Sequence, residues 1–358
     1  NLGRRNLVIN GAMTVAQRST SVTGVTSGGY KTCDRWSVSN TSQGTWTISQ
    51  SSTAPSDFAN SLKFDCTTAD GTTAASDQLG VDTRIEAKDL IQLNYGTSSA
   101  KKITVSFHVR SNKTGTYTFE AYAQDPNRGF SKTYTIDSAD TWEKKVITIP
   151  GDTAASTNFN HDHGIGFQLK WWLAAGSTFT GGTYADNVWD ANTNANRVSP
   201  SNVNLADSTS NEWYITGVQV ELGSAATEFE HLPVGETLAL CQRYLYRRRL
   251  KQYDVMALGH SIGGNLGRYL INLPTAMRIR PSVSDGGDIG CWYSNGGAIT
   301  AQTGLANIYM PSDEKDFNQI YLTADASATI NSNTYTLALT ASNGSANADS
   351  YVQLDAEL

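Results

Sequence analysis

Apolar and polar positions alternate along most of the first two thirds of the chain. Between residues 102 and 110 the odd-numbered positions from 103 to 109 are apolar, and Thr, Ser and His lie between them. A period of two residues is typical of a strand with one buried face. The stretch 116–123 repeats the pattern, and the Asn-Lys-Thr-Gly segment at 112–115 predicts a hairpin whose glycine takes a positive φ. Similar runs occur at residues 45–50, 62–66, 132–136, 144–149, 165–171 and 213–222.

Turn-forming Gly, Asn, Asp and Ser residues separate these runs at short intervals. Many short alternating strands with such punctuation predict an all-β protein built on an antiparallel sandwich. Two connections, residues 50–61 and 179–211, are longer and polar, so we expect loops that cross between the sheets.

The pattern changes after residue 232. Pro233 opens a stretch of good helix formers in which Leu238, Cys241 and Leu245 fall on one helical face, which predicts a short helix. Short alternating runs then resume. We therefore expect an N-terminal sandwich at 1–232, a helical connector at 233–250 and a smaller C-terminal β-sandwich domain at 251–358. These later runs are residues 255–260, 268–273, 289–294, 318–323, 334–340 and 350–354.

Charge and hydropathy narrow the possible partners. The 358 residues carry a formal charge of −6, and the sequence pI is near 5.4. An acidic chain is poorly suited to binding a phosphate backbone, so we expect no nucleic-acid partner. No apolar run approaches the roughly 18 residues of a membrane helix, so we expect no membrane insertion. The chain starts without Met or a signal pattern, so we expect either a processed start or the distal part of a longer protein.

The histidines and cysteines suggest neither a metal site nor a cofactor. His161 and His163 could begin a metal site, but no further ligand follows at a recognisable spacing, so we predict a solvated loop. The cysteines show no CxxC spacing. We predict buried free thiols, with one long-range disulfide as the alternative. The four are Cys33, Cys66, Cys241 and Cys291.

Residues 259–263, Gly-His-Ser-Ile-Gly, match the nucleophile elbow of serine hydrolases. That mechanism needs an acid and then a histidine downstream of the serine, whereas His260 is the last histidine in the chain. The flanking pattern predicts a strand after Ser261 rather than a helix. We therefore interpret the segment as a glycine-rich hairpin tip. Since no carboxylate pair stands out either, we predict that the protein is not an enzyme.

A basic run is the only strong charge cluster. Its arginines could capture an anionic glycan or phosphate. Alternatively, the alternation of Tyr and Arg at 244–248 fits a strand or helix end packed at a subunit interface, and the negative overall charge favours this second interpretation. The run consists of Arg243, Arg247, Arg248, Arg249 and Lys251.

Aromatic residues in polar surroundings are candidates for sugar contact, because sugars stack their apolar faces on rings while amides and carboxylates bind the hydroxyls. A tryptophan in a loop can equally anchor that loop onto the sandwich. As a ligand-binding site we predict Trp172, Tyr184, Asp186, Asn187 and Trp189 in the first domain, and Tyr293, Asn295 and Tyr309 in the second.

Several segments together resemble the tail-fibre proteins of bacteriophages that carry a jelly-roll domain of the carbohydrate-binding-module type. The resemblance spans essentially the whole chain and is strongest at 6–36 and 211–246. The segments that carry it are 6–13 (NLVINGAM), 17–18 (QR), 33–36 (CDRW), 213–223 (WYITGVQVELG), 226–231 (ATEFEH), 239–244 (ALCQRY) and 354–358 (LDAEL).

The resemblance implies a non-enzymatic adhesin of the virion, usually a homotrimer. Such a protein attaches the particle to host cell-surface polysaccharide or to an outer-membrane receptor, and it contacts other virion tail proteins. It also implies a jelly-roll fold for residues 1–232 and a receptor-binding tip in 251–358. Modules of this type often hold a structural calcium through an aspartate of the last strand. Residues 215–218, Ile-Thr-Gly-Val, lack that acid, so we expect no calcium site here.

Two other functions stay open at this point. A purely structural virion component, such as a fibre adaptor or a capsid decoration, would contact other virion proteins and not the host. A polysaccharide depolymerase is the less expected alternative, because its usual repeat architecture and an identifiable acid pair are absent from the sequence.

Overall fold

The computed structural model divides the chain into two compact units, residues 1–237 with Leu358, and residues 238–357. The backbone is described for residues 4–251, 254–263, 266–286, 289–295, 298–301, 305–309, 319–326, 337–341 and 350–358. Side chains are described for residues 4–251, 254–262, 266–286, 289, 321–322 and 350–358.

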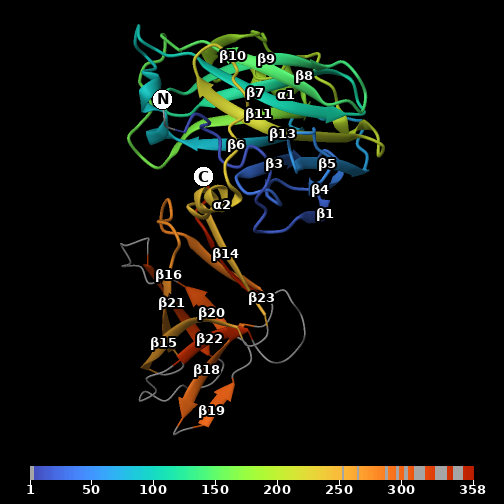
Figure 1. Ribbon diagram of the computed structural model, residues 1–358. Coiled ribbons are helices and arrows are strands. Elements are labelled where there is room, and N and C mark those ends of the chain that lie inside the picture. The colour runs from blue at the N-terminus through green and yellow to red at the C-terminus, as the bar shows by residue number, and fades with distance from the viewer. Residues whose placement is uncertain are drawn as a thin grey trace. The chain divides into compact units, whose positions relative to one another are not determined.

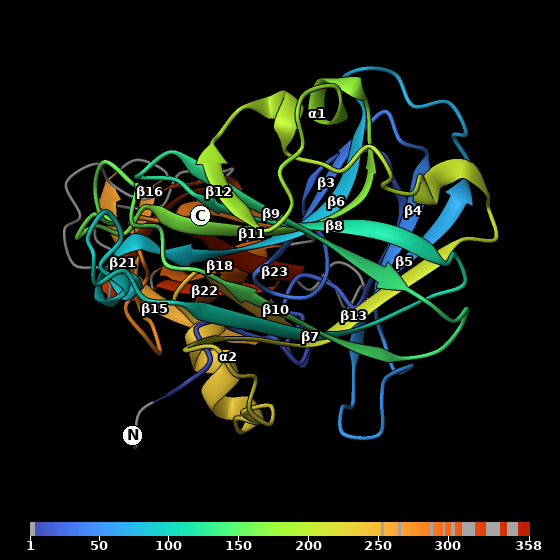
Figure 2. The same ribbon diagram turned by 90° about the horizontal axis from the view of Figure 1, so that it is seen from above.

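The first unit is a sandwich of two antiparallel sheets (Figures 1 and 2). The six-stranded sheet has the order β1-β4-β5-β13-β7-β10, and the seven-stranded sheet has the order β12-β9-β8-β11-β6-β3-β2. The strands of the six-stranded sheet are β1 (Ser21–Val25), β4 (Thr45–Ser51), β5 (Ser61–Thr68), β13 (Glu212–Leu222), β7 (Ile103–Ser111) and β10 (Glu143–Ile149). Those of the seven-stranded sheet are β12 (Val188–Ala191), β9 (Arg128–Ile136), β8 (Gly115–Ala123), β11 (Ile165–Ala175), β6 (Gln78–Glu86), β3 (Trp36–Thr41) and β2 (Gly29–Tyr30).

The core between the sheets confirms the alternation seen in the sequence. The apolar side chains of β7 at positions 103 to 109 are fully buried, whereas the polar side chains between them lie on the outer face. Each large ring removed from water stabilises the fold by about 1.5 to 3 kcal/mol. The large rings of this core include Trp36, Trp46, Phe64, Phe107, Trp171 and Trp213.

Two predicted connections are wrong. β7 and β8 do not form a hairpin, because β7 pairs with β10 and β13, while β8 pairs with β9 and β11 in the other sheet. Residues 112–114 therefore carry the chain across the sandwich, with Gly115 at φ +127°. Residues 52–60 do not cross, since β4 and β5 are neighbours in one sheet. Alternation identifies the buried face of a strand but not its partner, and both errors come from that gap.

The connection from β11 to β13 is more ordered than a loop. It contains the short helix α1 (Ser177–Thr180) and the edge strand β12. Figure 2 shows α1 on the side of β8 and β11 that faces away from β7 and β13. The first unit also has four one-turn helices: η1 (Ala87–Asp89), η2 (Ile91–Leu93), η3 (Asn194–Asn196) and η4 (Leu205–Asp207).

The predicted helix is present as α2 (Val234–Gln242), which begins directly after Pro233, where a proline suits the first turn. Leu245, which was expected on the same helical face, lies instead in the strand that follows. The second unit contains a three-stranded sheet with the order β14-β23-β17. Its β14 is the first strand of the unit and pairs with β23, the last strand, so the two ends of the unit lie side by side. Arg247, Arg248 and Arg249 of the basic run lie in β14. The three strands are β14 (Leu245–Leu250), β23 (Ser350–Asp355) and β17 (Ser282–Gly286).

The other sheet of the second unit has the order β19-β18-β22-β15-β16-β21-β20 and is antiparallel throughout. The chain is thus all-β, as predicted, with little helix. The strands are β15 (Val255–Gly263), β16 (Leu266–Asn272), β18 (Ile289–Asn295), β19 (Ala298–Ala301), β20 (Leu305–Tyr309), β21 (Gln319–Ala326) and β22 (Leu337–Ala341).

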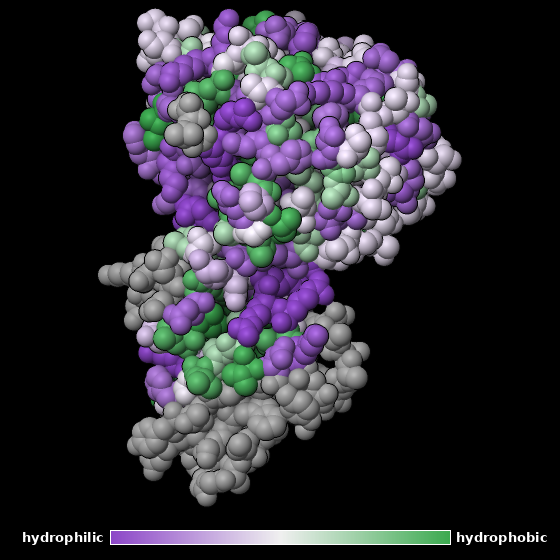
Figure 3. Space-filling view, viewed as in Figure 1, coloured by the Kyte–Doolittle hydropathy of each residue, from purple (hydrophilic) through white to green (hydrophobic). Residues whose placement is uncertain are grey.

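The surface of the first unit is mostly hydrophilic or neutral on the face in Figure 3, where hydrophobic side chains occur singly or in small groups. No helix in the described part of the chain is long and apolar enough to cross a membrane.

Candidate functional site

A groove with a volume of about 650 Å³ lies on the outer face of the six-stranded sheet. Strands β7, β10 and β13 form its floor. The connection at residues 52–60 and the segment at 224–231, which follows β13, form its walls. The lining residues are Ser106, His108, Lys144 and Gly217 on the floor, and Asp57, Phe58, Glu228, Phe229 and His231 on the walls.

A bulge in β13 opens the floor of the groove. Thr216 pairs with His108 and Gln219 pairs with Ser106, so β13 has one residue more than β7 over this stretch. Gly217 takes φ +62°, a conformation that suits glycine. A Cβ atom at this position would lie 2.6 Å from Cζ of Phe58 and 2.8 Å from Nδ1 of His108. Glycine at this position therefore allows the rings of Phe58 and His108 to lie close to the backbone of β13.

The segment at 224–231 is held in place by two buried side chains of β13. Glu221 accepts hydrogen bonds from the backbone and the hydroxyl of Thr227, both at 2.8 Å. Gln219 accepts a hydrogen bond from the backbone N–H of Glu230 at 2.8 Å and donates one to the carbonyl of Glu228 at 3.3 Å. These contacts fix Glu228 and Phe229, which lie between them, at the edge of the groove.

Aromatic rings form the apolar part of the groove. The ring of Phe58 lies 5.0 Å from that of Phe229, 5.2 Å from that of His231 and 5.3 Å from that of His108. Phe229 and His231 are also in contact, with 4.8 Å between ring centroids. Both phenyl rings are only partly buried, so part of their surface faces solvent.

Several polar side chains of the groove make few or no hydrogen bonds or ion pairs with the described residues. Within the described part of the chain, the ammonium of Lys144 and the carboxylate of Glu228 have no hydrogen bond or ion pair. Asp57 has a single weak contact, from Ser56 at 3.4 Å. Nδ1 of His108 is buried and has no partner among the described residues. Burial, and then the charge of Lys144, lowers the pKa of His108, while Asp57 and Glu228 act in the opposite direction.

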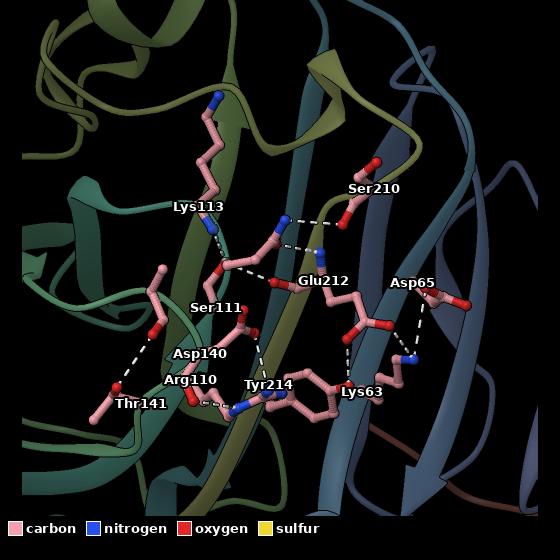
Figure 4. Close-up of polar contacts among 12 residues, drawn as sticks. Lys63, Asp65, Arg110, Ser111, Lys113, Asp140, Thr141, Ser210, Glu212 and Tyr214 are labelled. Atoms are coloured by element: carbon pink, nitrogen blue, oxygen red, sulfur yellow. Dashed lines mark hydrogen bonds and ion pairs between the residues drawn. The ribbon is translucent and has the colours of Figure 1, made fainter.

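The neighbouring part of the same sheet face is different, because its charges are paired (Figure 4). Glu212 accepts hydrogen bonds from Lys63 and from the Tyr214 hydroxyl, each at 2.6 Å. Burial alone would raise the pKa of Glu212, but these two hydrogen bonds outweigh it and hold the pKa below its usual value. Arg110 pairs with Asp140 at 2.9 Å and lies over the Tyr214 ring. The charged side chains of this region are paired with one another, unlike Lys144 and Glu228 of the groove, for which the described residues provide no partner.

The structure does not expose Trp172, contrary to our expectation. Its indole is fully buried on the outer face of the seven-stranded sheet, beneath residues 176–199, which we call the cover segment. Its Nε1 donates a hydrogen bond to Glu120 at 2.8 Å, and the Lys170 ammonium lies 3.6 Å from the ring centre. Arg197 of the cover segment binds Glu120 through two hydrogen bonds, at 2.7 and 3.0 Å. A sugar cannot reach this ring while the cover segment is in place.

Trp189 was expected in a loop and instead lies in β12, opposite Phe130 of β9. It is 9% exposed and joins the main core, with its ring 5.5 Å from that of Tyr95, and Nε1 donates a hydrogen bond to the Pro150 carbonyl at 2.7 Å. Trp189 therefore anchors its own segment onto the sandwich, which is the alternative interpretation of a loop tryptophan.

Tyr184, Asp186 and Asn187 attach the cover segment to β9. The Tyr184 hydroxyl donates to Asp186 at 2.9 Å, and Asp186 also binds Lys132 and the backbone N–H of Thr133. Asn187 has φ +66°, and its N–H donates to the Ser131 carbonyl at 2.7 Å. These three residues lie together, but on a different sheet from the groove.

In the second unit, Tyr293 and Asn295 belong to β18, and Tyr309 belongs to β20. Their side chains, like that of Cys291, lie outside the described residues.

The residues of the groove lie far apart in the sequence, and only part of them carried a signal. His108 occupies an outward position of an alternating strand, and a glycine within a strand pattern, such as Gly217, indicates a bulge or a close approach. Phe58 belongs to no pattern in the sequence, whereas Phe229 and His231 lie in the 226–231 motif (ATEFEH), which carries the family resemblance but did not indicate a binding site.

The other candidate chemistry finds little support in the structure. Ser261 lies in β15, which pairs with β16 as antiparallel neighbours, so the strand-to-helix turn of a nucleophile elbow is absent at this serine. Among the residues described, no group of three His, Cys, Asp or Glu side chains is placed to hold a metal ion. The prediction of buried free thiols is confirmed for Cys33 and Cys66, and Cys241 is also buried.

The residues behind the sequence resemblance have a structural role. Asn6 binds the backbone of β13 through hydrogen bonds with Val218 and Val220 at 3.1 and 3.0 Å, next to the Gly217 bulge. Asn10 donates to the carbonyls of Val15 and Asp34, both at 2.9 Å. These side chains fix the start of the chain to the sandwich, so they would be needed whatever the groove binds.

No family model matches the chain, and no curated protein matches it. Solved structures similar to it include the enzymatically active domain of bacteriophage CBA120 tailspike protein 4, with 14% identity, a TM-score of 0.32 and coverage of 61% of this chain but 21% of that one. A putative sugar binding protein from Bacteroides thetaiotaomicron has 13% identity, a TM-score of 0.35 and coverage of 61% and 100%. A family 11 carbohydrate-binding module from Clostridium thermocellum has 12% identity, a TM-score of 0.27 and coverage of 59% and 98%.

These likenesses are too loose to support an argument about ligand or activity. The aligned region is about a fifth of the tailspike chain.

Proposed function

We propose that the protein is a non-catalytic glycan-binding adhesin and that the groove on the six-stranded sheet is its binding site. The observation that supports this most is the combination of accessible Phe58 and Phe229 rings with polar groups that the fold leaves unpaired. A sugar ring offers an apolar C–H face to an aromatic side chain and hydroxyls to carboxylates, ammonium groups and imidazoles. The groove presents both kinds of partner within one space.

The energetics favour a ligand rich in hydroxyls. A partly buried polar group without a partner costs free energy, and a hydrogen bond from a ligand removes that cost. Nδ1 of His108 is such a group. Each site alone would bind weakly, and several copies on one particle would raise the overall affinity by avidity.

We further propose that the chain is part of a bacteriophage tail fibre and attaches the virion to host cell-surface polysaccharide. The support is the resemblance of residues 6–36 and 211–246 to such fibres. A homotrimer in contact with other virion tail proteins, with residues 251–358 at the receptor-facing tip, belongs to the same proposal. An outer-membrane protein as receptor and a purely structural virion role are the outcomes that would replace it.

The test is binding of the labelled full chain to an array of bacterial surface polysaccharides and to host cells before and after removal of those polysaccharides. We expect saturable binding that is lost with the polysaccharide and falls at least about fivefold in Phe229→Ala, since a stacked ring is worth on the order of 1 kcal/mol or more. Tyr184→Ala is the matched control, because it removes a half-buried ring from the other sheet. Binding that depends on Tyr184 and not on Phe229 would overturn the assignment of the groove.

A further inference from the structure

We propose that the groove selects a zwitterionic sugar unit, one that carries an ammonium group together with a phosphate or carboxylate. This inference rests on the proposed glycan-binding function and adds the charge pattern of the ligand. It is drawn from how the charged side chains of the groove are distributed around its aromatic rings.

The acidic side of the groove coincides with its aromatic side. Asp57 directly precedes Phe58 in one wall, and Glu228 directly precedes Phe229 in the other. The two phenyl rings lie 5.0 Å apart, and both acidic residues line the same groove as this ring pair. Aromatic faces and carboxylates both attract a cation, and an ammonium group that loses part of its hydration is held best where the two occur together.

The basic side of the groove is formed by the sheet. Lys144 of β10 lies opposite His108 of β7 in register, and its side chain is exposed. Its ammonium has no ion pair with any residue that the structure describes, although Lys145, its neighbour in β10, binds Glu143 at 2.6 Å. Lys144 is therefore available as a point charge for a phosphate or a carboxylate.

Ligands with only one kind of charge fit less well. A purely anionic sugar would pair with Lys144 but meet Asp57 and Glu228. A sugar with only an ammonium group would satisfy the acids and meet Lys144. A neutral sugar would leave all three charges without an opposite charge. A unit with both charges can pair with both sides of the groove at once.

Four monosaccharides that differ only in these charges provide the test: glucose, glucosamine, glucose 6-phosphate and glucosamine 6-phosphate. Their affinities for the full chain can be measured by ligand-observed nuclear magnetic resonance at millimolar concentrations. We expect glucosamine 6-phosphate to bind at least about tenfold more tightly than glucose 6-phosphate, which corresponds to one charged contact of about 1.4 kcal/mol.

Two variants assign the preference to its residues. Glu228→Gln keeps the shape of the side chain and should reduce the preference for the amino sugars over their hydroxyl counterparts. Lys144→Gln should remove the preference for the phosphorylated sugars and leave the amino preference in place. A matched control is Lys145→Gln, which changes a paired lysine of the same strand and should alter neither preference.

The outcomes separate this inference from the function on which it rests. Equal binding of all four sugars, or tightest binding of glucose, would overturn the zwitterionic inference even if polysaccharide binding still required Phe229. Polysaccharide binding that is unchanged in Phe229→Ala would overturn the proposed function itself. A charge preference that persists in both Glu228→Gln and Lys144→Gln would place charge selection outside the groove and would also overturn the inference.

Discussion

The two outer faces of the sandwich each carry aromatic and charged residues, but those on one face are covered by another segment and those on the other face are accessible. On the seven-stranded sheet, Trp172 with Glu120 and Lys170 forms an aromatic and charged cluster that the cover segment closes. On the six-stranded sheet, Phe58 and Phe229 with their neighbouring charges form a cluster that stays open. The charges of the first cluster have partners within the chain, whereas Lys144 and Glu228 of the second have none among the residues that the structure describes.

The difference shows why residue type alone does not identify a binding site. On both faces an aromatic ring lies near carboxylates and a lysine, which is the residue composition of a sugar-binding site. Whether it acts as one depends on whether a distant segment already satisfies its polar groups. Beside Trp172 it is Arg197 that satisfies Glu120, and its guanidinium lies 5.2 Å from the centre of the Trp172 ring.

The largest effect should follow from breaking the closed face. Arg197→Met removes two of the hydrogen bonds to Glu120, which is 1% exposed, and leaves a buried carboxylate without its charge partner. We expect a loss of about 3 to 5 kcal/mol in the free energy of unfolding, measured by chemical denaturation. Arg197→Lys should lose less, because it keeps the charge. A loss below about 1 kcal/mol in Arg197→Met would show that the cover segment is held by other contacts.

Lys170 should show the cost of enclosing a charge on the closed face. Burial lowers its pKa to about 8, although Glu120 and Asp82 act in the opposite direction. The unfolded chain then binds more protons than the folded chain between about pH 8 and 10.5, so the stability contribution of this lysine rises with pH across that window. We expect the wild type to gain up to about 3 kcal/mol over Lys170→Met between neutral pH and pH 10.5. Parallel pH profiles of unfolding for the two proteins would contradict this.

A single methyl group added at position 217 should weaken ligand binding in the groove. In Gly217→Ala the new Cβ must displace Phe58 and His108, so we expect glycan affinity to fall at least about tenfold, or about 1.4 kcal/mol. The positive φ adds about 1 kcal/mol of strain. Gly24→Ala is the control, because Gly24 has φ +68° and no atom within 4 Å of its Cβ position. Equal loss of binding in the two variants would attribute the effect to backbone strain and not to the groove.

The smallest expected effect is the pH response of His108. Its pKa lies below the usual 6.5, so its stabilising effect is present above pH 6.5 and is lost as the pH falls toward the lower folded-state value. In His108→Gln the free energy of unfolding should depend less on pH below 6.5 than in the wild type. A steeper dependence in the variant would show that the sign is wrong.

The sequence predicted the strands that are marked by their own alternation, whereas strands without a clear alternation, such as β3 and β6, were not predicted. The buried positions of β7 and the start of α2 after Pro233 both follow from local residue preferences. The sheet partners could not be predicted in this way, and the expected hairpin between β7 and β8 is an example. Its turn residues suit a hairpin, but the two strands pair in different sheets.

The binding site was harder to predict because it depends on contacts over long distances. The burial of Trp172 is decided by Arg197 and Phe179 of the cover segment, which follow it by many residues without a fixed spacing. The groove in turn depends on Phe58 and Phe229, which are brought together only when both walls fold onto β13. The local signals that point to the groove are the outward position of His108 in an alternating strand and Gly217 as a glycine within a strand pattern.

The most direct test of the account is amide hydrogen exchange of the full chain with and without a surface polysaccharide that it binds. If the groove is the site, exchange should slow at residues 54–60, 106–108 and 226–231 and stay unchanged in the cover segment. Slower exchange in the cover segment around Tyr184 and Trp189, with no change in the groove, would contradict the account and return the site to the seven-stranded sheet.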